Sequence, residues 1–331
     1  MLTFHKEEIK ASINGALALR TKINEIVDPI YDQGITNICF MGIGGTLASS
    51  MQVVTHMQEK SSLEVICQSA AEYTTTGNRR IGSGTLLVLS SVSGTTKEIV
   101  SAVTKAKVYG ATVLGFIDNK DAVLARMVDH VVTYPANEQL KFFMVADRLM
   151  FHEGVFSDYE EYYTELEEHL ADALVDVGEK SEEFAREFVA AHHEDMIHYF
   201  VGAGNQWGAT YSYAMCYWEE QHWLRTKSIH AAEFFHGMFE IVDKNTNVTV
   251  FVGEDSQREL AVRVANFLPQ ICHRYTIIDT KNYTLEGISE KYRGSISHLV
   301  MRQVCHRIDM EMERVNAHPT VIRRYYRQLE Y

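Results

Sequence analysis

Residues 35–57 read I-T-N-I-C-F-M-G-I-G-G-T-L-A-S-S-M-Q-V-V-T-H-M and predict a strand, a glycine turn and a helix, in that order. The segment is continuously apolar from Ile38 to Met41, which is typical of a strand covered on both faces. The turn at 42–46 then leads into a helical pattern at 47–57. Free amides at such a helix start attract anions. A dinucleotide fingerprint is not favoured, because the G-x-G-x-x-G frame that starts at Gly42 has leucine at position 47.

Strand and helix signals alternate on both sides of this stretch. A leading helix is predicted at 6–33 and a short connection at 70–73. Further strands are predicted at 63–67, 85–90, 111–117 and 130–133, and further helices at 98–108, 122–127 and 140–152. This alternation predicts a three-layer domain with a parallel sheet. Residues 158–182 are acidic and helical, with Gly178 as a predicted break, and are interpreted as connecting helices on the surface.

The pattern begins again in the second half of the chain. A glycine turn at 202–208 follows a predicted strand, about 160 residues after the turn at 42, which indicates an internal duplication. Strands are predicted at 197–201, 247–252 and 275–278, a short strand or extended turn at 228–231, and helices at 181–192, 210–218, 257–268 and 300–315. The predicted fold class is α/β, with two three-layer αβα domains at residues 1–160 and 161–331, each around a central parallel sheet.

Composition excludes several classes of function. A chain of 331 residues can hold two domains with separate cores. The formal net charge of −13 disfavours nucleic acid or an anionic membrane as the main partner. The five cysteines form no C-x-x-C pair, so neither a disulfide framework nor a cysteine zinc site is expected. The start M-L-T-F-H-K-E-E has no apolar signal region and no segment is long enough to cross a bilayer, so we expect a cytoplasmic protein with no membrane partner.

Hydroxyl side chains gather where the strand at 85–90 ends. Residues 91–98 read S-V-S-G-T-T-K-E and lead into a helix. Several hydroxyls and a glycine at the carboxyl end of a strand offer neutral donors and amides to a phosphate. The alternative is an ordinary Ser/Thr helix cap with an acid three positions later. One cap needs one hydroxyl, and this loop supplies several.

Ionisable residues are crowded among aromatic ones at residues 220–240, E-Q-H-W-L-R-T-K-S-I-H-A-A-E-F-F-H-G-M-F-E. We expect Glu220 to close a helix and His236 to open the next. A carboxylate and an imidazole that converge on one cavity could move a proton between neighbouring carbons of a sugar. The alternative is a solvated glutamate and a packed, hydrogen-bonded histidine.

The C-terminal tail, residues 318–331, contains three arginines and three tyrosines. Free chain ends are usually small and polar, so this composition indicates a tail that is tied to the body or to a partner subunit, beside an anion. The alternative is a basic surface tail.

These motifs together resemble the sugar isomerase (SIS) family. S-x-S-G-x-T-x-E at 91–98 is similar to the family's phosphate loop, and G-G-T at 44–46 is similar to its C-G-G-S turn. I-H-A-A-E-F-F-H-G-M-F-E at 229–240 is similar to the family's I-H-x-G-E-F-x-H-G-P-x-E. The family's catalytic glutamate lies sixteen positions before the second histidine of this motif, and 236 − 16 is position 220. The resemblance covers essentially the whole chain, in the double-domain arrangement of the isomerase half of glucosamine-6-phosphate synthase.

The tail places the resemblance in one branch of the family. H-P at 318–319 and R-R-Y at 323–325 resemble the ending of the bacterial fructosamine deglycases, which split 6-phosphorylated sugar–amino acid adducts such as fructoselysine 6-phosphate. The synthase carries a Schiff-base lysine in this region, whereas no lysine follows Lys291 here. Ala232 and Met238 replace the family's usual glycine and proline, so loop shape and substrate choice are expected to differ.

The resemblance implies a set of roles. Glu220 and His236 would be catalytic, and the products would be hexose 6-phosphate and a free amino acid, formed without a metal or an organic cofactor. A homodimer with a shared active site is also implied. Substrate-binding residues by resemblance are Gly44, Gly45, Thr46, Ser91, Ser93, Thr96, His230, Glu233, Arg324 and Tyr325.

Other functions stay open at this stage. One is an amino-sugar-phosphate deaminase or isomerase, which would need no pocket for an amino acid beyond C1. Another is a sugar-phosphate sensor without catalysis. A metal hydrolase built on His192, His193 or His198 is less favoured, because no H-E-x-x-H spacing occurs.

Overall fold

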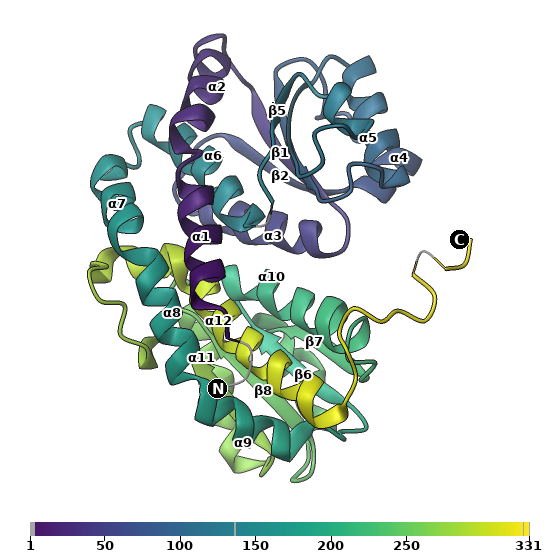
Figure 1. Cartoon of the computed structure of the whole chain (residues 1–331), viewed down its shortest axis with the longest axis vertical. Helices are drawn as coiled ribbons and strands as arrows, with labels where there is room; N and C mark the ends of the chain where they lie inside the picture. Colours follow the sequence, from purple (N-terminus) through teal and green to yellow (C-terminus); the bar gives the residue numbers. More distant parts are fainter. Residues whose placement is uncertain (1–3, 136, 327, 331) are drawn as a thin grey trace. The chain divides into compact units, whose positions relative to one another are not determined.

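The computed structural model describes residues 4–135, 137–326 and 328–330 (Figure 1). The chain divides into two compact units. The first unit holds residues 5–171, and the second holds the chain from residue 172 onward together with Phe4. Each unit has one parallel sheet flanked by helices, which confirms the predicted α/β fold class.

The first unit contains a five-stranded sheet in the order β2-β1-β3-β4-β5, with every pair parallel. β1 and β3 are buried along their whole length, because helices cover both faces of the sheet. This burial explains why both strands were predicted from continuous apolar runs. The strands are β1 (Asn37–Gly42), β2 (Glu64–Ser69), β3 (Thr85–Ser91), β4 (Thr112–Ile117) and β5 (His130–Val132).

Alternate residues of β1 face the two halves of the core. Cys39 and Met41 belong to one cluster of buried residues, which also contains Tyr73 of α4 and residues of α5. Phe40 points to the opposite face, where its ring lies 5.5 Å from that of Phe142 in α6. In Figure 1, α4 and α5 lie on one side of this sheet and α1, α2 and α6 on the other. The helices are α1 (Lys6–Leu17), α2 (Arg20–Asp32), α3 (Gly45–Gln58), α4 (Ala70–Thr76), α5 (Lys97–Val108) and α6 (Glu138–His152).

Two predictions in the first unit were wrong. The leading helix is two helices, which end and begin around Ala18 and Leu19, and Pro29 lies inside the second of them. The predicted connection at 70–73 is the helix α4, whose first turn is capped by Ser69 Oγ as it accepts a hydrogen bond from Glu72 N at 3.4 Å. A seven-residue helix rich in threonine carries too little periodicity to be recognised.

The second unit repeats the strand order of the first. Its sheet has the order β7-β6-β8-β9, all parallel, so its first strand lies between the second and third as in the first unit. Gly44 after β1 has φ 58° and ψ −127°, and Gly204 after β6 has φ 61° and ψ −137°. This agreement supports the predicted duplication. The strands are β6 (His198–Gly202), β7 (Thr226–His230), β8 (Asn247–Val252) and β9 (Tyr275–Asp279).

Helices cover both faces of this second sheet. On one face α10 packs on β6 and on α12, and α12 packs on α9. On the other face α11 packs on β8. The fully buried ring of Phe200 in β6 contacts Trp218 and Phe251, which form the aromatic part of the core. The helices are α9 (Glu182–His192), α10 (Asn205–Ser212), α11 (Arg258–Phe267) and α12 (Glu290–Asn316).

The acidic segment between the two sheets is more buried than predicted. It forms α7 (Tyr159–Glu165), one π-helical turn and α8 (Ala171–Lys180), and the side chains of Tyr159 and Tyr163 are fully buried. Gly178 lies inside α8 and does not break it. The ring of Phe4 occupies the place that a side chain at this position would take, which accounts for glycine here. The predicted start of the last helix was also wrong. The sequence analysis placed it at residue 300, whereas α12 begins at Glu290.

Within the described part of the chain, no helix is both long and apolar enough to span a bilayer.

A buried hydrogen-bonded cluster joins the end of α9 to β6. Asp195 Oδ2 accepts hydrogen bonds from His192 Nδ1 at 2.7 Å and from His198 Nδ1 at 2.9 Å, and Asp195 Oδ1 accepts one from Arg274 at 3.0 Å. His198 Nε2 lies 2.7 Å from Thr249 Oγ1, which donates to it when the ring is neutral. Burial lowers the pKa of His198 to about 4, so the imidazole stays neutral.

We predict that His198 makes the free energy of unfolding fall as the pH drops from about 6.5 to about 4. The unfolded chain takes up a proton at the ordinary pKa of histidine, whereas the folded chain resists protonation until about pH 4. A shift of this size corresponds to about 3 kcal/mol over the whole window. NMR titration of the imidazole and urea denaturation across this range measure the effect. His198→Gln should show a weaker pH dependence, and a titration midpoint near 6.5 in the folded protein would contradict the prediction.

Candidate functional site

The predicted phosphate residues lie at the topological switch point of the first sheet. β1 and β3 are neighbours and parallel, so the turns that follow them lie at the same edge. The chain continues from β1 towards β2 on one side and from β3 towards β4 on the other. A crevice between two such turns is where open α/β sheets bind ligands. The residues at these turns are Gly44, Gly45, Thr46, Ser91, Ser93 and Thr96.

The turn after β1 presents the start of α3. Thr46 Oγ1 accepts a hydrogen bond from Ile43 N and donates one to Ile43 O, both at 3.0 Å, so this hydroxyl stabilises the turn. The positive φ of Gly44 reverses the chain at this point. Leu47 N and Ala48 N donate to Gly44 O at 3.1 and 3.2 Å, so the amides of Gly45 and Thr46 are those left at the helix start to bind an anion.

The loop after β3 is stabilised by its own hydroxyls. Ser91 Oγ accepts a hydrogen bond from Gly94 N at 3.1 Å, and Ser93 Oγ accepts one from Thr95 N at 3.3 Å. Thr96 begins α5, but its side chain makes no capping hydrogen bond. Ordinary helix capping therefore does not account for this hydroxyl.

The matching turn of the second unit is occupied by a carboxylate of the same unit. Asp255 Oδ2 accepts a hydrogen bond from Asn205 N at 3.0 Å, and Gln257 Oε1 accepts one from Gly204 N at 3.2 Å. The first amides of α10 are thus bound by side chains that follow β8. A side chain at Gly204 would collide with Asp255. The second turn binds an internal anion, and the sequence analysis did not identify Asp255 or Gln257 in this role.

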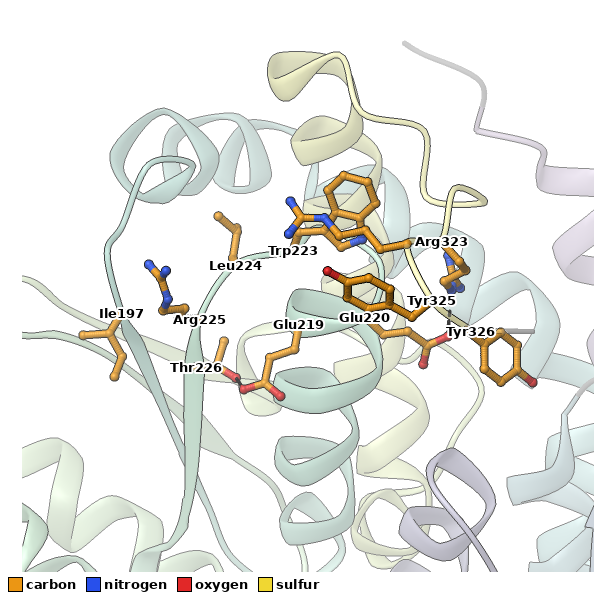
Figure 2. A pocket seen from close by; sticks show the side chains of 11 residues that line it. Ile197, Glu219, Glu220, Trp223, Leu224, Arg225, Thr226, Arg323, Tyr325 and Tyr326 are labelled. Carbon is orange, nitrogen blue, oxygen red and sulfur yellow. Dashed lines mark hydrogen bonds and ion pairs between the residues drawn. The ribbon is translucent and has the colours of Figure 1, made fainter. Parts of the chain in front are cut away.

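Glu220 borders a cavity of about 600 Å³ in the second unit. As predicted, Glu220 closes a helix, the π-helical turn Tyr213–Glu219. Its side chain is 40% exposed, and its Oε1 accepts a hydrogen bond from Arg323 Nε at 2.8 Å. Figure 2 shows this ion pair at one side of the cavity. The lining residues are Ile197, Glu219, Glu220, Trp223, Leu224, Arg225, Thr226, Arg323, Arg324, Tyr325 and Tyr326.

The tail forms one wall of the cavity and contacts the body of its own unit. The guanidinium of Arg324 lies 4.0 Å from the centre of the Trp223 ring, and the ring of His318 lies 4.1 Å from it. Trp223 has φ 60°, an unusual value for a bulky residue, and this conformation follows the end of the helix. Trp223 is therefore the anchor on which the tail packs.

The remaining predicted residues lie on a separate segment after β7. His230 Nδ1 accepts a hydrogen bond from Ala232 N at 3.1 Å and caps the 3-10 helix Ala231–His236. Burial lowers the pKa of His230, with Glu233 acting in the opposite direction. His236 was expected to open the next helix, but it closes this one, and Gly237 separates it from the 3-10 helix Met238–Ile241. His236 and Glu233 are exposed and do not line the cavity.

The structure thus brings Glu220, Arg324 and Tyr325 to one cavity and places His230, Glu233 and His236 elsewhere in the same unit. The sequence analysis did not select Arg323, although it belongs to the R-R-Y motif. It also missed Arg225 as a lining residue. No local pattern signals the contact of Arg323 with Glu220, because this ion pair joins residues 103 positions apart.

His192, Asp195 and His198 present ligand-type atoms within 4.8 Å of one another. These atoms are already joined by hydrogen bonds, and the guanidinium of Arg274 adds a positive charge 3.0 Å from Asp195 Oδ1. A positive charge at that distance opposes cation binding. The cluster fits a structural role.

Comparison with known proteins matches the part of the chain that contains the two turns of the first unit. Residues 30–148 match the family model of the SIS domain. The chain contains a SIS domain. It is 26% identical to fructosamine deglycase FrlB of Bacillus subtilis, over 94% of this chain and 97% of that protein. It is 22% identical to fructoselysine 6-phosphate deglycase of Escherichia coli K12, over 92% and 89% of the two chains.

Solved structures show the same fold. A crystal structure from Salmonella typhimurium LT2 matches with a TM-score of 0.88 at 22% identity, over 94% of this chain and 99% of that chain. The C-terminal domain of glucosamine-fructose-6-phosphate aminotransferase from Francisella tularensis matches with a TM-score of 0.75 at 12% identity, over 93% and 94%. The glycine turn after β1 and the hydroxyl loop after β3 both lie inside the SIS domain.

We predict that Gly94→Ala destabilises the SIS domain more than Gly154→Ala does. Both glycines have positive φ, 63° and 76°, so both substitutions introduce backbone strain of about 1–2 kcal/mol. A Cβ at position 94 would also collide with Ala122, whereas position 154 is open, and overpacking adds about 1–3 kcal/mol. Urea denaturation measures the difference. Adding Ala122→Gly to Gly94→Ala should recover stability, and equal costs at the two positions would show that crowding plays no part.

Proposed function

We propose that the protein is a deglycase that cleaves a 6-phosphorylated sugar–amino acid adduct, similar to fructoselysine 6-phosphate, into hexose 6-phosphate and a free amino acid. The names of two relatives that match along nearly the whole chain support this substrate class. The proposal includes a homodimer with a shared active site, no metal or organic cofactor, and a cytoplasmic location.

The cavity beside Glu220 is the observation that carries the proposal. An isomerase or deaminase of a simple amino sugar phosphate needs no space beyond C1, whereas an adduct carries an amino acid there. The cavity of about 600 Å³ has the size of a small-molecule site. Arg225 and Arg324 line it, and neither has an ion-pair partner among the described residues. They are suited to bind the α-carboxylate of the amino acid.

The phosphate end of the substrate is assigned to the crevice between β1 and β3. The net charge of −13 provides no general attraction for an anion, so the site must be local. Helix-start amides at Gly45 and Thr46, and the hydroxyls of Ser91, Ser93 and Thr96, supply donors without a fixed positive charge. Binding energy at this remote phosphate positions the reacting carbons.

In the proposed reaction Glu220 removes a proton from C1 of the open-chain ketosamine and returns one to C2. The intermediate is an enaminol, because C1 carries an amine. The resulting C1 imine takes up water and releases the amino acid, which leaves the aldehyde of the hexose 6-phosphate. His236 does not line the cavity of its own chain, so in this scheme it comes from the other subunit of the proposed homodimer and assists ring opening by moving the proton of the anomeric hydroxyl. His230 and Glu233, on the segment before His236, bind substrate in this scheme, as do Arg324 and Tyr325.

We predict that the protein releases a free amino acid and a hexose 6-phosphate, in equal amounts, from C1-linked 6-phosphorylated adducts. The unphosphorylated adducts should react far more slowly, because they lose the anchor in the crevice. A panel of C1-linked and C2-linked adducts, assayed for amino acid and hexose phosphate, measures both properties. Release of ammonia from glucosamine 6-phosphate, with no turnover of any adduct, would favour the deaminase alternative.

We predict that Glu220→Gln lowers kcat on the best adduct by about 10²–10⁴-fold, which is the usual contribution of a general base. The amide is isosteric, so the affinity for a reduced, unreactive adduct should change little. Calorimetric titration with that reduced adduct separates binding from chemistry. Glu219→Gln is the matched comparison, since Glu219 is a neighbouring lining acid that is bonded to Thr226 at 2.8 Å. Full activity of Glu220→Gln would remove Glu220 from the role of base.

A further inference from the structure

Arg323 is held by the tail in a fixed orientation. Its NH1 donates to the carbonyl oxygens of Thr320 and Ile322, and its own carbonyl accepts a hydrogen bond from Gln328 Nε2 at 2.7 Å. Its side chain is 20% exposed. The planar guanidinium therefore has one edge bound to the tail backbone, while Nε points to Glu220.

Glu220 is bound on one side alone. Oε1 accepts the hydrogen bond from Arg323, whereas Oε2 has no hydrogen-bond partner among the described residues. A carboxylate needs one free oxygen to accept a proton from carbon. This single contact restrains one oxygen of the carboxylate and leaves the other for the reaction, which a bidentate arginine pair would not.

The tail brings Arg323 to this position because it packs on Trp223. Arg324 and His318 both contact the Trp223 ring, so the two sides of Arg323 in the chain are attached to the same anchor. Figure 2 shows Arg323 beside the carboxylate of Glu220, and Trp223 also lies at the wall of this cavity. A glutamate at a helix end would otherwise sample several rotamers.

We propose that Arg323 is a positioning residue for the proposed reaction, and that docking of the tail on Trp223 prepares Glu220 for proton transfer. The inference rests on the proposed function, in which Glu220 is the base. A base that is displaced by about 1 Å can lower the rate by about 10²-fold. Holding Glu220 in one rotamer should therefore have a measurable effect on kcat. If Arg323 instead blocked Glu220, the substitution Arg323→Ala would raise kcat.

The first experiment separates turnover from binding in the full-length protein. Arg323→Ala should lower kcat on the best C1-linked adduct by about 10–100-fold, with KM changed by less than about threefold. Added guanidinium chloride at millimolar concentration should restore part of kcat in Arg323→Ala and have no such effect on the parent protein. Arg80→Ala is the matched control, because Arg80 forms an exposed pair with Glu64 at 2.6 Å outside the site. Unchanged or increased kcat in Arg323→Ala would overturn the inference.

A second measurement tests the anchor without using activity. Trypsin cleaves after Arg323 and Arg324, so docking on Trp223 should slow removal of the tail, as followed by mass spectrometry. Trp223→Ala should speed cleavage, whereas Trp223→Phe should keep a ring for Arg324 and retain protection. Equal rates of cleavage in Trp223→Ala and in the parent protein would contradict docking of the tail on Trp223.

The double variant Trp223→Ala/Arg323→Ala tests whether the two residues act together. It should lose no more kcat than the single variants, because both residues act through the carboxylate of Glu220.

The outcomes for Glu220 and Arg323 are distinguishable. If Glu220→Gln is fully active, the proposed role of Glu220 fails, and the inference about Arg323 fails with it. If Glu220→Gln is inactive while Arg323→Ala turns over like the parent protein, the proposed function stands and the inference alone is overturned.

Discussion

The glycine turn at the carboxyl end of the first strand of each unit is the constraint on which the rest of the structure depends. Gly42 and Gly202 end β1 and β6, and a side chain at either position would collide with the helix that follows. Two residues later, Gly44 and Gly204 adopt the same positive φ. The chain can then reverse tightly enough for the next helix to start at the edge of the sheet. Its unpaired amides collect at the switch point, where they require an acceptor.

The two units meet that requirement in different ways. In the second unit, Asp255 and Gln257 occupy the amides of Asn205 and Gly204, so the acceptor is part of the fold. In the SIS domain the equivalent turn faces a loop of hydroxyls, which can both donate and accept hydrogen bonds. Duplication of one unit therefore accounts for both the proposed phosphate site and the second turn, which is occupied by side chains of its own unit. The difference lies in which side chains follow the third strand of each sheet.

The sheet could be predicted from sequence because its signals are local. Strands that are buried on both faces give continuous apolar runs, and glycine marks the turns that follow them. The errors arose where tertiary contacts override local signals. Gly178 lies inside a helix, where the ring of Phe4 packs against it, and α12 begins ten residues earlier than predicted, with Gly294 close to the backbone at Glu254. The acidic helices are partly buried because their tyrosines face the core.

The candidate site was predictable only where its residues form a local motif. The hydroxyl loop is a contiguous motif, so the sequence located it at the carboxyl end of a strand, and the strand order of the structure places that end at the switch point. Glu220 was found at the end of a helix, but the residue that binds it was not, because the pairing is formed by the fold across the length of the second unit. The positive φ of Trp223, which gives the tail its anchor, has no signal in the sequence either.

The paired arginines of the tail illustrate why residue type matters at such a contact. Arg323 must donate in two directions, to tail carbonyls and to Glu220, and a lysine ammonium on a flexible stem cannot hold both in a fixed plane. Arg324 uses the flat face of its guanidinium on Trp223, a contact that also favours arginine. Glu220 and Trp223 are three positions apart, so two consecutive arginines engage an acid and a ring on one short segment. Because the two arginines are adjacent in the chain, we expect that weakening one of these contacts also loosens the other.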